Sequence, residues 1–184
     1  MQLLFTRFVK QGKMFWDTRA ASLEDQVLMP VTDPVEMGMP SLEMLVEKLK
    51  KRPYYPALFE RAFGSTAITK ERIAQALAQF IRALASFQST FDRGVDSDFS
   101  NLTVIERRGL EKVNAYCGSC HSDRVTIGPG LPPTFLFLET PPQNNGLEQV
   151  STDNGVGDIT GIAADKGRFK IPSLRDIELT APYM

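Results

Sequence analysis

Apolar residues recur at helical spacing through most of the first half of the chain. Ser41 precedes a stripe at i, i+3, i+4 and i+7 that consists of Leu42, Leu45, Val46 and Leu49. This spacing predicts a helix over that stretch with Ser41 as its N-cap. Pro56 suits the first position of a further short helix that runs to Phe63, and Gly64 provides a left-handed stop.

The longest stripe follows Thr69, which is expected to open the longest helix. Its apolar members share one helical face: Ile73, Leu77, Phe80, Ile81, Leu84 and Phe87. Such a stripe is more often ordinary core than part of a cofactor site. Residues 91–102 are charged, contain a glycine and show no period, so we place a domain boundary there, between 1–92 and 93–184.

The second half opens with another helix signal and then loses its periodicity. Thr103 and Glu106 form a capping box that predicts a helix to about Ala115. From 128 to 161, eleven of 34 positions are Gly or Pro, which excludes a long helix there. Phe135 and Phe137 within that stretch are expected to pack against core or cofactor. The fold class predicted is therefore mainly α.

Composition narrows the possible functions. The chain has 184 residues, of which 42% are hydrophobic, with 21 basic and 22 acidic side chains. The chain can thus bury a hydrophobic core of normal size, and it lacks the excess of basic side chains that nucleic-acid binding requires. No run of about 18 apolar residues is present, so we expect no membrane span. The first sixteen residues do not resemble a signal peptide, because charges interrupt a short apolar run.

The two cysteines and the single histidine stand together as Cys117-Gly118-Ser119-Cys120-His121. This C-x-x-C-H spacing is typical of c-type haem attachment, in which both thiols bond to the haem vinyl groups and the imidazole binds the iron. A redox-active dithiol is an alternative, although the expected βαβ context is missing. A metal site is a third, weaker alternative, because a structural zinc ion needs four ligands.

Two segments near the N-terminus suggest more than packing. Phe15-Trp16-Asp17-Thr18-Arg19-Ala20 contains the single tryptophan, and the segment from Met29 to Pro40 is expected to be a loop stiffened by three prolines. Glu36 in this loop is flanked by apolar residues, so burial would raise its pKa and suit it to proton transfer. Composition alone favours an ordinary solvated carboxylate.

Three stretches together resemble a known family. Phe15 to Met39, the C-x-x-C-H motif, and Phe169 to Met184 are similar, in that order, to the bacterial di-haem cytochrome c peroxidases, which include the MauG-type enzymes. The resemblance implies two cytochrome-c-like domains, each with one covalent haem. The chain would then hold the C-terminal part of the peroxidatic domain and most of the electron-entry domain.

The resemblance also implies roles for individual residues. Cys117 and Cys120 would attach the electron-entry haem c, and His121 would be its proximal iron ligand. Trp16 matches a tryptophan between the two haems, which implies an electron bridge. Electrons would come from a small donor protein, either a cytochrome c or a cupredoxin, and reduce hydrogen peroxide to water.

At the peroxide pocket and the domain interface the resemblance implies four further residues. Glu36 matches a carboxylate that moves protons between the peroxide oxygens, and Gln26 matches an amide that orients peroxide or that carboxylate. Thr180 and Pro182 match positions whose backbone carbonyls bind a structural calcium ion, a cation that prefers oxygen ligands. The match favours a functional Glu36.

The sequence departs from the family pattern in several places. It lacks the family's first C-x-x-C-H and a calcium-binding Asn, and the helix that carries the sixth haem ligand, Met or Tyr, would follow Met184. We therefore expect an internal fragment of a longer periplasmic protein, with a signal peptide upstream, which would not reduce peroxide alone. A homodimer is possible by analogy with the family.

Two alternative functions remain open at this point. One is a MauG-like oxidase that acts on a protein substrate. The other is a single-haem electron-transfer cytochrome, in which Met184 would be the thioether ligand.

Overall fold

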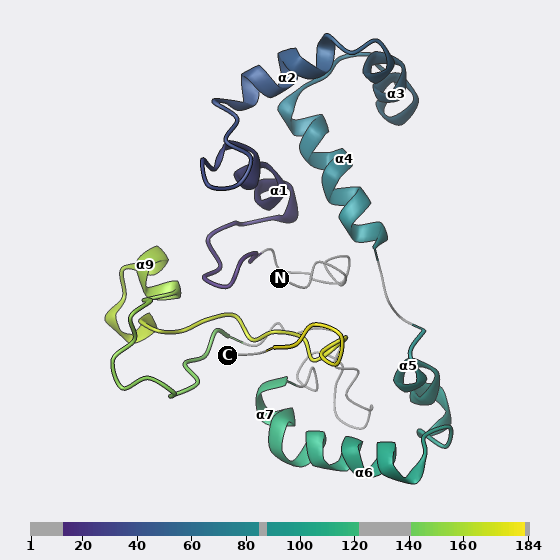
Figure 1. Ribbon diagram of the computed structural model, residues 1–184, viewed down its shortest axis with the longest axis vertical. Coiled ribbons are helices and arrows are strands. Elements are labelled where there is room, and N and C mark those ends of the chain that lie inside the picture. The colour runs from purple at the N-terminus through teal and green to yellow at the C-terminus, as the bar shows by residue number, and fades with distance from the viewer. Residues whose placement is uncertain (1–12, 85–87, 122–140, 183–184) are drawn as a thin grey trace.

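The computed structural model describes residues 13–84, 88–121 and 141–182. Within these ranges the chain is mainly helical, as predicted, and forms no strand; three isolated bridges are present. Two groups of helices lie at opposite ends of the long axis, and residues 141–182 lie between them (Figure 1). The expected locations of Phe135, Phe137, Phe87 and Met184 fall outside the described residues.

The first group consists of four helices: α1 (Leu23–Thr32), α2 (Leu42–Lys50), α3 (Tyr54–Phe63) and α4 (Lys70–Ala83). The Ser41 and Thr69 side chains accept hydrogen bonds from the amides of Met44 and Arg72, which confirms both predicted N-caps. α3 begins two residues before Pro56, but it ends where expected, at Gly64 with φ 70°.

The buried face of α4 differs from the predicted stripe. Ile73, Ala74 and Ala78 are buried, whereas Leu77 and Phe80 are 39% and 63% exposed. Ala78 belongs to the same apolar cluster as Leu23 of α1, so α1 packs on the face of α4 that carries the small residues. Close approach of two helices favours alanine at the contact, which an analysis of large apolar residues overlooks.

The proline-rich segment from Met29 to Pro40 is not wholly a loop, and this expectation was wrong. Pro30 lies inside the last turn of α1, which runs to Thr32. The helix persists because its terminal carbonyls are satisfied from outside: the amides of Met37 and Met39 donate to the Pro30 and Val31 carbonyls at 3.2 and 2.9 Å. The segment that follows is folded back onto the end of α1.

The second group contains α5 (Thr90–Gly94), the 3₁₀ turn η2 (Val95–Ser97), α6 (Val104–Lys112), the π-helical turn η3 (Val113–Cys117) and α7 (Gly118–His121). The Thr103–Glu106 capping box is present in both directions, as predicted. The helix continues past the expected end at Ala115 to His121. Of the stretch 91–102, expected to be irregular, residues 91–97 are helical, and Ser89 and Asp92 form a second capping box at the start of this helix.

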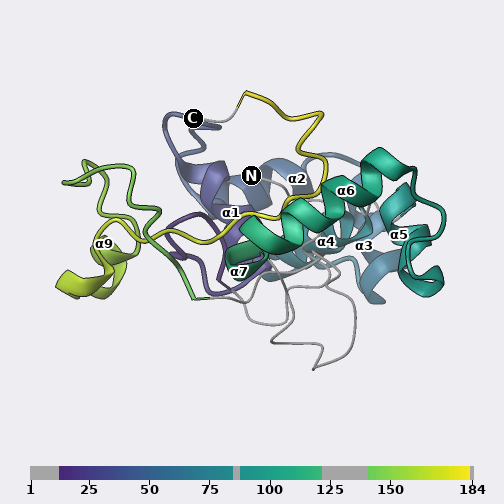
Figure 2. The ribbon, with the colours of Figure 1, turned by 90° about the horizontal axis from the view of Figure 1, so that it is seen from below.

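Residues 141–182 are largely irregular and form the third part of the structure. They contain α9 (Val156–Thr160) and the 3₁₀ turn η4 (Ala163–Asp165). From this lobe the chain runs back towards α6 and α7, as the yellow trace in Figure 2 shows. Main-chain bonds between Gln143 and Phe169, 2.9 Å in each direction, hold the two ends of the lobe together.

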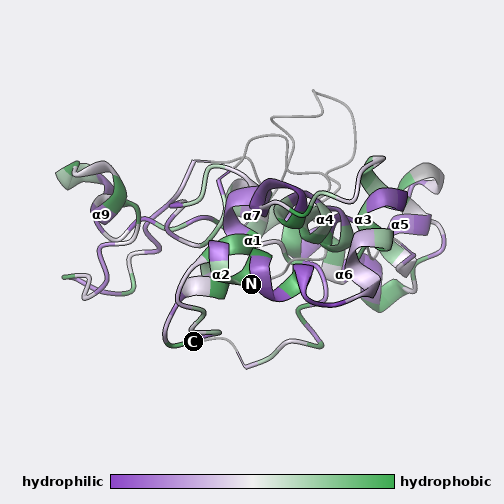
Figure 3. Ribbon diagram, turned by 90° about the horizontal axis from the view of Figure 1, so that it is seen from above, coloured by the Kyte–Doolittle hydropathy of each residue, from purple (hydrophilic) through white to green (hydrophobic). Residues whose placement is uncertain are grey.

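Hydropathy along the described helices is mixed rather than uniformly apolar (Figure 3). Among the described residues, no helix combines the length and apolarity that a membrane crossing requires.

Candidate functional site

The C-x-x-C-H motif occupies the end of one continuous helical stretch. α6, η3 and α7 follow each other without a break from Val104 to His121. The wide π-helical turn ends at Cys117, the first cysteine of the motif; such turns occur frequently at functional sites. Cys117 is half-buried and Cys120 is exposed, and both are free thiols. Both cysteines are thus available to react.

The imidazole of His121 is held by a residue far away in the sequence. Its Nδ1 lies 2.9 Å from the backbone carbonyl oxygen of Pro172. Since a carbonyl can only accept a hydrogen bond, Nδ1 carries the proton and Nε2 presents its lone pair. A second hydrogen bond of this kind fixes the tautomer and ring orientation of metal-ligating histidines. The residues of the motif therefore fit covalent haem with His121 as an iron ligand.

The described residues contain no cluster of side chains that could bind a metal ion by itself. Across the ranges that the structure describes, no three His, Cys, Asp or Glu side chains gather as ligands for an ion. Thr180 and Pro182 are exposed in the C-terminal stretch, where the Thr180 hydroxyl donates to the Asp176 carbonyl at 3.2 Å. Calcium binding by the backbone carbonyls of Thr180 and Pro182 stays a prediction.

Trp16 lies in a short turn closed by main-chain pairing of Met14 with Ala20. The side chain is 50% exposed. Its backbone carbonyl accepts a 2.8 Å hydrogen bond from the amide of Lys170. The turn is therefore attached to the stretch that also contacts His121.

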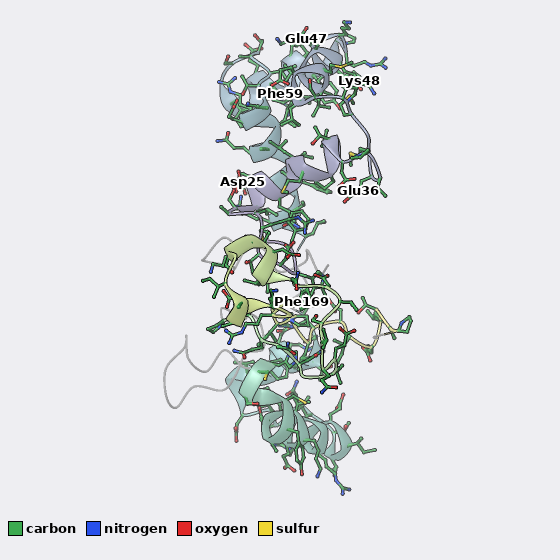
Figure 4. All side chains as sticks on the ribbon, turned by 90° about the vertical axis from the view of Figure 1, so that its left-hand side faces the viewer. Asp25, Glu36, Glu47, Lys48, Phe59 and Phe169 are labelled. Atoms are coloured by element: carbon green, nitrogen blue, oxygen red, sulfur yellow. The ribbon has the colours of Figure 1, made fainter. Side chains whose placement is uncertain are left out.

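Residues 169–172, which we call the connecting segment, join these two sites. Lys170 is hydrogen-bonded to Trp16, and Pro172, two residues later, accepts from His121. The Lys170 ammonium also donates to the Lys13 carbonyl at 3.3 Å, and desolvation by burial lowers its pKa. Phe169, the first residue of the segment, lies between the two helical groups in Figure 4. Sequence reasoning missed Lys170 and Pro172, although both lie in the stretch that resembles the family.

A cavity of about 220 Å³ opens beside the Trp16 turn. It is lined by Phe15, Arg19, Met29, Pro30, Thr32, Asp33 and Glu36. The Arg19 guanidinium lies 3.6 Å from the centre of the Phe15 ring and pairs with Asp17 at 2.9 Å. The cavity thus brings the N-terminal aromatic turn next to the segment that follows α1.

Glu36 reaches this cavity from a tightly folded turn. Its amide donates to the Asp33 carbonyl at 3.2 Å, and the Gly38 amide donates to the same carbonyl at 2.7 Å. The side chain itself is exposed, so the burial considered from the sequence is not observed among the described residues (Figure 4). The structure therefore fixes the backbone of Glu36 while leaving its carboxylate accessible.

Gln26 is separate from that cavity. It is buried within α1, with 4% of its surface exposed, and is not among the residues that line the cavity. Of the residues expected to serve peroxide chemistry, the structure places Glu36 beside the Trp16 turn and leaves Gln26 in the helix core. A role of Gln26 in orienting peroxide or Glu36 stays a prediction.

A helix that ends in Cys-x-x-Cys-His, with the imidazole oriented through Nδ1, defines the class of c-type haem proteins. Comparison with known families is more specific, because the model for di-haem cytochrome c peroxidases matches residues 2–100. The chain belongs to the di-haem cytochrome c peroxidase family, an oxidoreductase family for which haem c is the implied cofactor.

Relatives with two kinds of name are similar to this chain. A methylamine utilization protein MauG from Methylophilus methylotrophus is 34% identical over 175 residues, which cover 93% of this chain and 49% of that protein. The cytochrome c peroxidase Ccp of Escherichia coli K12 is 33% identical over 173 residues, covering 93% of this chain and 36% of that protein. The chain spans about half the length of the MauG relative, or less in the case of Ccp.

A solved structure confirms the fold. The crystal structure of a MauG-like protein associated with microbial copper homeostasis superposes with a TM-score of 0.74 at 32% identity. The match covers 95% of this chain and 54% of that one. The mainly α, cytochrome-c-like fold predicted from the sequence is therefore confirmed.

Proposed function

We propose that this chain is part of an enzyme that reduces hydrogen peroxide to water with electrons from a small redox protein. The observation that carries this proposal is the cavity shared by Glu36 and Phe15, the residue before Trp16. It brings a carboxylate suited to proton transfer next to the turn that contains the expected electron bridge. The peroxidase names among the relatives support the same reaction.

The chemistry divides between haem and protein. When bound, haem supplies an iron that exchanges single electrons and coordinates oxygen ligands. Cys117 and Cys120 would hold one such group by thioether bonds, and His121 would bind its iron through Nε2. The sequence contains one histidine, so the family's second haem would be ligated from elsewhere in the whole protein.

Glu36 would move the protons of the reaction. The overall conversion takes hydrogen peroxide, two electrons and two protons to two water molecules. The Glu36 carboxylate would accept a proton from one oxygen of hydrogen peroxide and return it to the other oxygen, which would leave as water. A carboxylate in this role needs access to water for the second proton, and the exposure of Glu36 provides it.

The test uses the complete di-haem protein with Glu36→Gln. We expect peroxide turnover to fall by about 10²–10⁴, the usual contribution of a general acid–base group, with both haem spectra unchanged. Glu60→Gln, which changes an exposed glutamate on α3, is the matched control. Turnover that stays within twofold of the wild type in Glu36→Gln would remove Glu36 from the mechanism.

A MauG-like oxidation of a protein substrate is the second candidate function. It is favoured by the MauG relatives and by the similarity to the MauG-like crystal structure. The sixth ligand of the His121 haem separates the two, with Met expected for the peroxidase and Tyr for the MauG type. Absorption and paramagnetic resonance spectra of the complete protein identify that ligand.

We further propose a periplasmic location and a cytochrome c or cupredoxin as the donor, because covalent haem is attached outside the cytoplasm. A homodimer and a structural calcium at Thr180 and Pro182 complete the proposal. Chelation of calcium followed by measurement of oligomeric state and peroxide turnover tests both.

A further inference from the structure

The connecting segment links Trp16 to His121 through its own backbone and one hydrogen bond at each end. This path starts at the Trp16 carbonyl, which is 2.8 Å from the Lys170 amide nitrogen, and ends at the Pro172 carbonyl, 2.9 Å from His121 Nδ1. One residue, Ile171, separates the two hydrogen-bonded residues and is 8% exposed. The path therefore consists of two hydrogen bonds and the complete backbone of three residues, from the Lys170 amide nitrogen to the Pro172 carbonyl oxygen.

The Trp16 end of this path is fixed by further contacts. Phe169 pairs with Gln143 through two main-chain bonds, so the start of the segment cannot shift freely. The Lys170 ammonium reaches across to the Lys13 carbonyl at 3.3 Å and ties the segment to the strand of chain that enters the Trp16 turn. Lys170 thus contacts the turn twice, once from its amide and once from its side chain.

A half-buried lysine is an unfavourable choice if its contact with the Lys13 carbonyl serves packing alone. Its side chain is half-buried, and its ammonium donates to a carbonyl rather than to a carboxylate. A charged group is placed in such surroundings at a cost, because its hydration is lost. A charged donor forms a stronger hydrogen bond than a neutral one, which suits a contact that must keep its geometry.

We propose that the connecting segment is the through-bond route for electrons between His121 and Trp16, and that Lys170 is the positioning residue that holds it in register. The inference rests on the proposed function, since it assumes that electrons enter at the His121 haem. Each electron supplied by the donor protein leaves to hydrogen peroxide, so the segment undergoes no net oxidation or reduction.

The experiment uses the complete di-haem protein and Lys170→Met, with Lys166→Met as the matched control. Lys166 is exposed, and its substitution removes the same charge at a position four residues before Lys170. In Lys170→Met we expect the backbone amides of Met14 and of residue 170, which donate to the Ala20 and Trp16 carbonyls, to exchange with deuterium about tenfold faster, the factor that loss of one charged hydrogen bond produces. The control should exchange like the wild type.

Electron transfer between the two haems is measured in the same proteins after photochemical reduction, without peroxide. Lys170→Met should slow this step by about tenfold, the same factor by which loss of the charged hydrogen bond weakens the contact with the Trp16 turn. The potential of the His121 haem should stay unchanged. Lys170→Arg, which keeps a charged donor, should restore most of the rate.

The possible outcomes decide between the explanations. Faster exchange together with slower transfer supports the inference. Slower transfer with normal exchange, or faster exchange with normal transfer, overturns it. If Lys170→Met does not accumulate, Lys170→Gln carries the same expectations, because its shorter side chain does not reach the Lys13 carbonyl. Normal electron transfer in a wild type that fails to reduce peroxide would contradict the proposed function alone.

Discussion

Helices α1 to α4 bury apolar side chains against one another, whereas the region around the Cys-x-x-Cys-His motif is joined mainly by polar contacts. In the first region two apolar clusters form, one around Leu23 and Ala78 and one around Phe59 and Ile73. In the second, α6, η3 and α7 contribute no buried residue within the part of the chain that the structure describes. Capping boxes, a buried ion pair and the His121–Pro172 bond hold it instead.

This difference has a physical consequence for both regions. Apolar burial tolerates small shifts, because it is roughly proportional to area and has no direction. Hydrogen bonds and ion pairs fix distances and angles, and their loss leaves unpaired polar groups. Non-directional apolar contacts therefore hold α1 to α4 together, whereas directional polar contacts hold the motif region and supply the orientation that a metal ligand needs.

The largest expected effect lies in the motif region, at the ion pair of Arg175 with Asp92. Their side chains are 8% and 12% exposed, and the pair joins the C-terminal stretch to α5. We expect Arg175→Met to lower the free energy of unfolding by about 3–5 kcal/mol, since the largely buried Asp92 carboxylate loses its counter-charge and keeps only its hydrogen bonds from Ser89. Denaturant unfolding of the haem-loaded protein measures this.

The control for Arg175 is Arg168→Met, which removes an arginine with a 41% exposed side chain, 3.7 Å from Asp165. It should cost less than about 1 kcal/mol. Equal losses in the two variants would contradict the idea that polar contacts hold the motif region.

In the helical region the sharpest test is Leu23→Ala. Leu23 is 1% exposed and belongs to the cluster between α1 and α4. Removing its side chain should cost about 2–5 kcal/mol, the range for buried leucines. Leu147→Ala, at a residue 66% exposed, should change stability by less than about 0.5 kcal/mol. A tolerant Leu23 site would show that apolar burial does not dominate this region.

Two glycines of the 141–182 lobe allow the cost of a positive φ to be distinguished from the cost of a steric clash. Gly155 and Gly146 both have positive φ, 55° and 71°, but a Cβ on Gly155 would fall on the Arg168 carbonyl and 2.8 Å from the Phe169 ring. Nothing lies within 4 Å of a Cβ on Gly146. We expect Gly146→Ala to cost about 1 kcal/mol and Gly155→Ala about 1–3 kcal/mol more. Thermal unfolding ranks them, and equal losses would exclude crowding.

The smallest effect concerns the partly exposed pair of Glu24 and Arg82, which joins α1 to α4 at 2.6 Å. Hydrogen bonds from Arg82 lower the pKa of Glu24 below its ordinary 4.5. A lowered carboxyl pKa stabilises the fold above pH 4.5, and this contribution is lost as the pH falls through the lower folded value. Glu24→Gln should therefore cost about 0.5 kcal/mol at neutral pH and nothing in strong acid.

Stability of Glu24→Gln across the pH range gives the measurement, with Glu111→Gln on α6 as the control. Glu111 is exposed, and its substitution should leave the pH profile parallel to that of the wild type. A constant difference between Glu24→Gln and the wild type down to pH 2 would contradict the assigned ion pair.

The sequence predicted those parts of the fold, such as helix N-caps, that depend on contacts between residues close together in the chain. The caps at Ser41, Thr69 and Thr103 were found because a side-chain oxygen and an amide three residues later make the contact. The Ser89–Asp92 box was missed because the charged, glycine-bearing stretch after it suggested a loop. Pro30 was assigned to a loop because the amides that complete its helix come from beyond it.

Contacts between distant segments could not be predicted in the same way. The cysteines and His121 were evident from their spacing, but the carbonyl that orients the imidazole lies 51 residues away. Nothing in the residue types of the Phe169–Pro172 stretch states that its backbone joins Trp16 to His121. The resemblance to a family indicated that the stretch matters, and the structure showed which of its atoms make contact.

The wide turn at Val113–Cys117 sets the rotational phase of the motif. An α-helix advances by about 100° per residue, whereas a π-helical turn accommodates more residues before the chain comes round again. The direction in which His121 points from the helix axis therefore differs from the direction it would have if the helix were regular α from Thr103 onwards. The same five residues wound as a regular α-helix would carry His121 further around the axis and point the imidazole away from the Pro172 carbonyl.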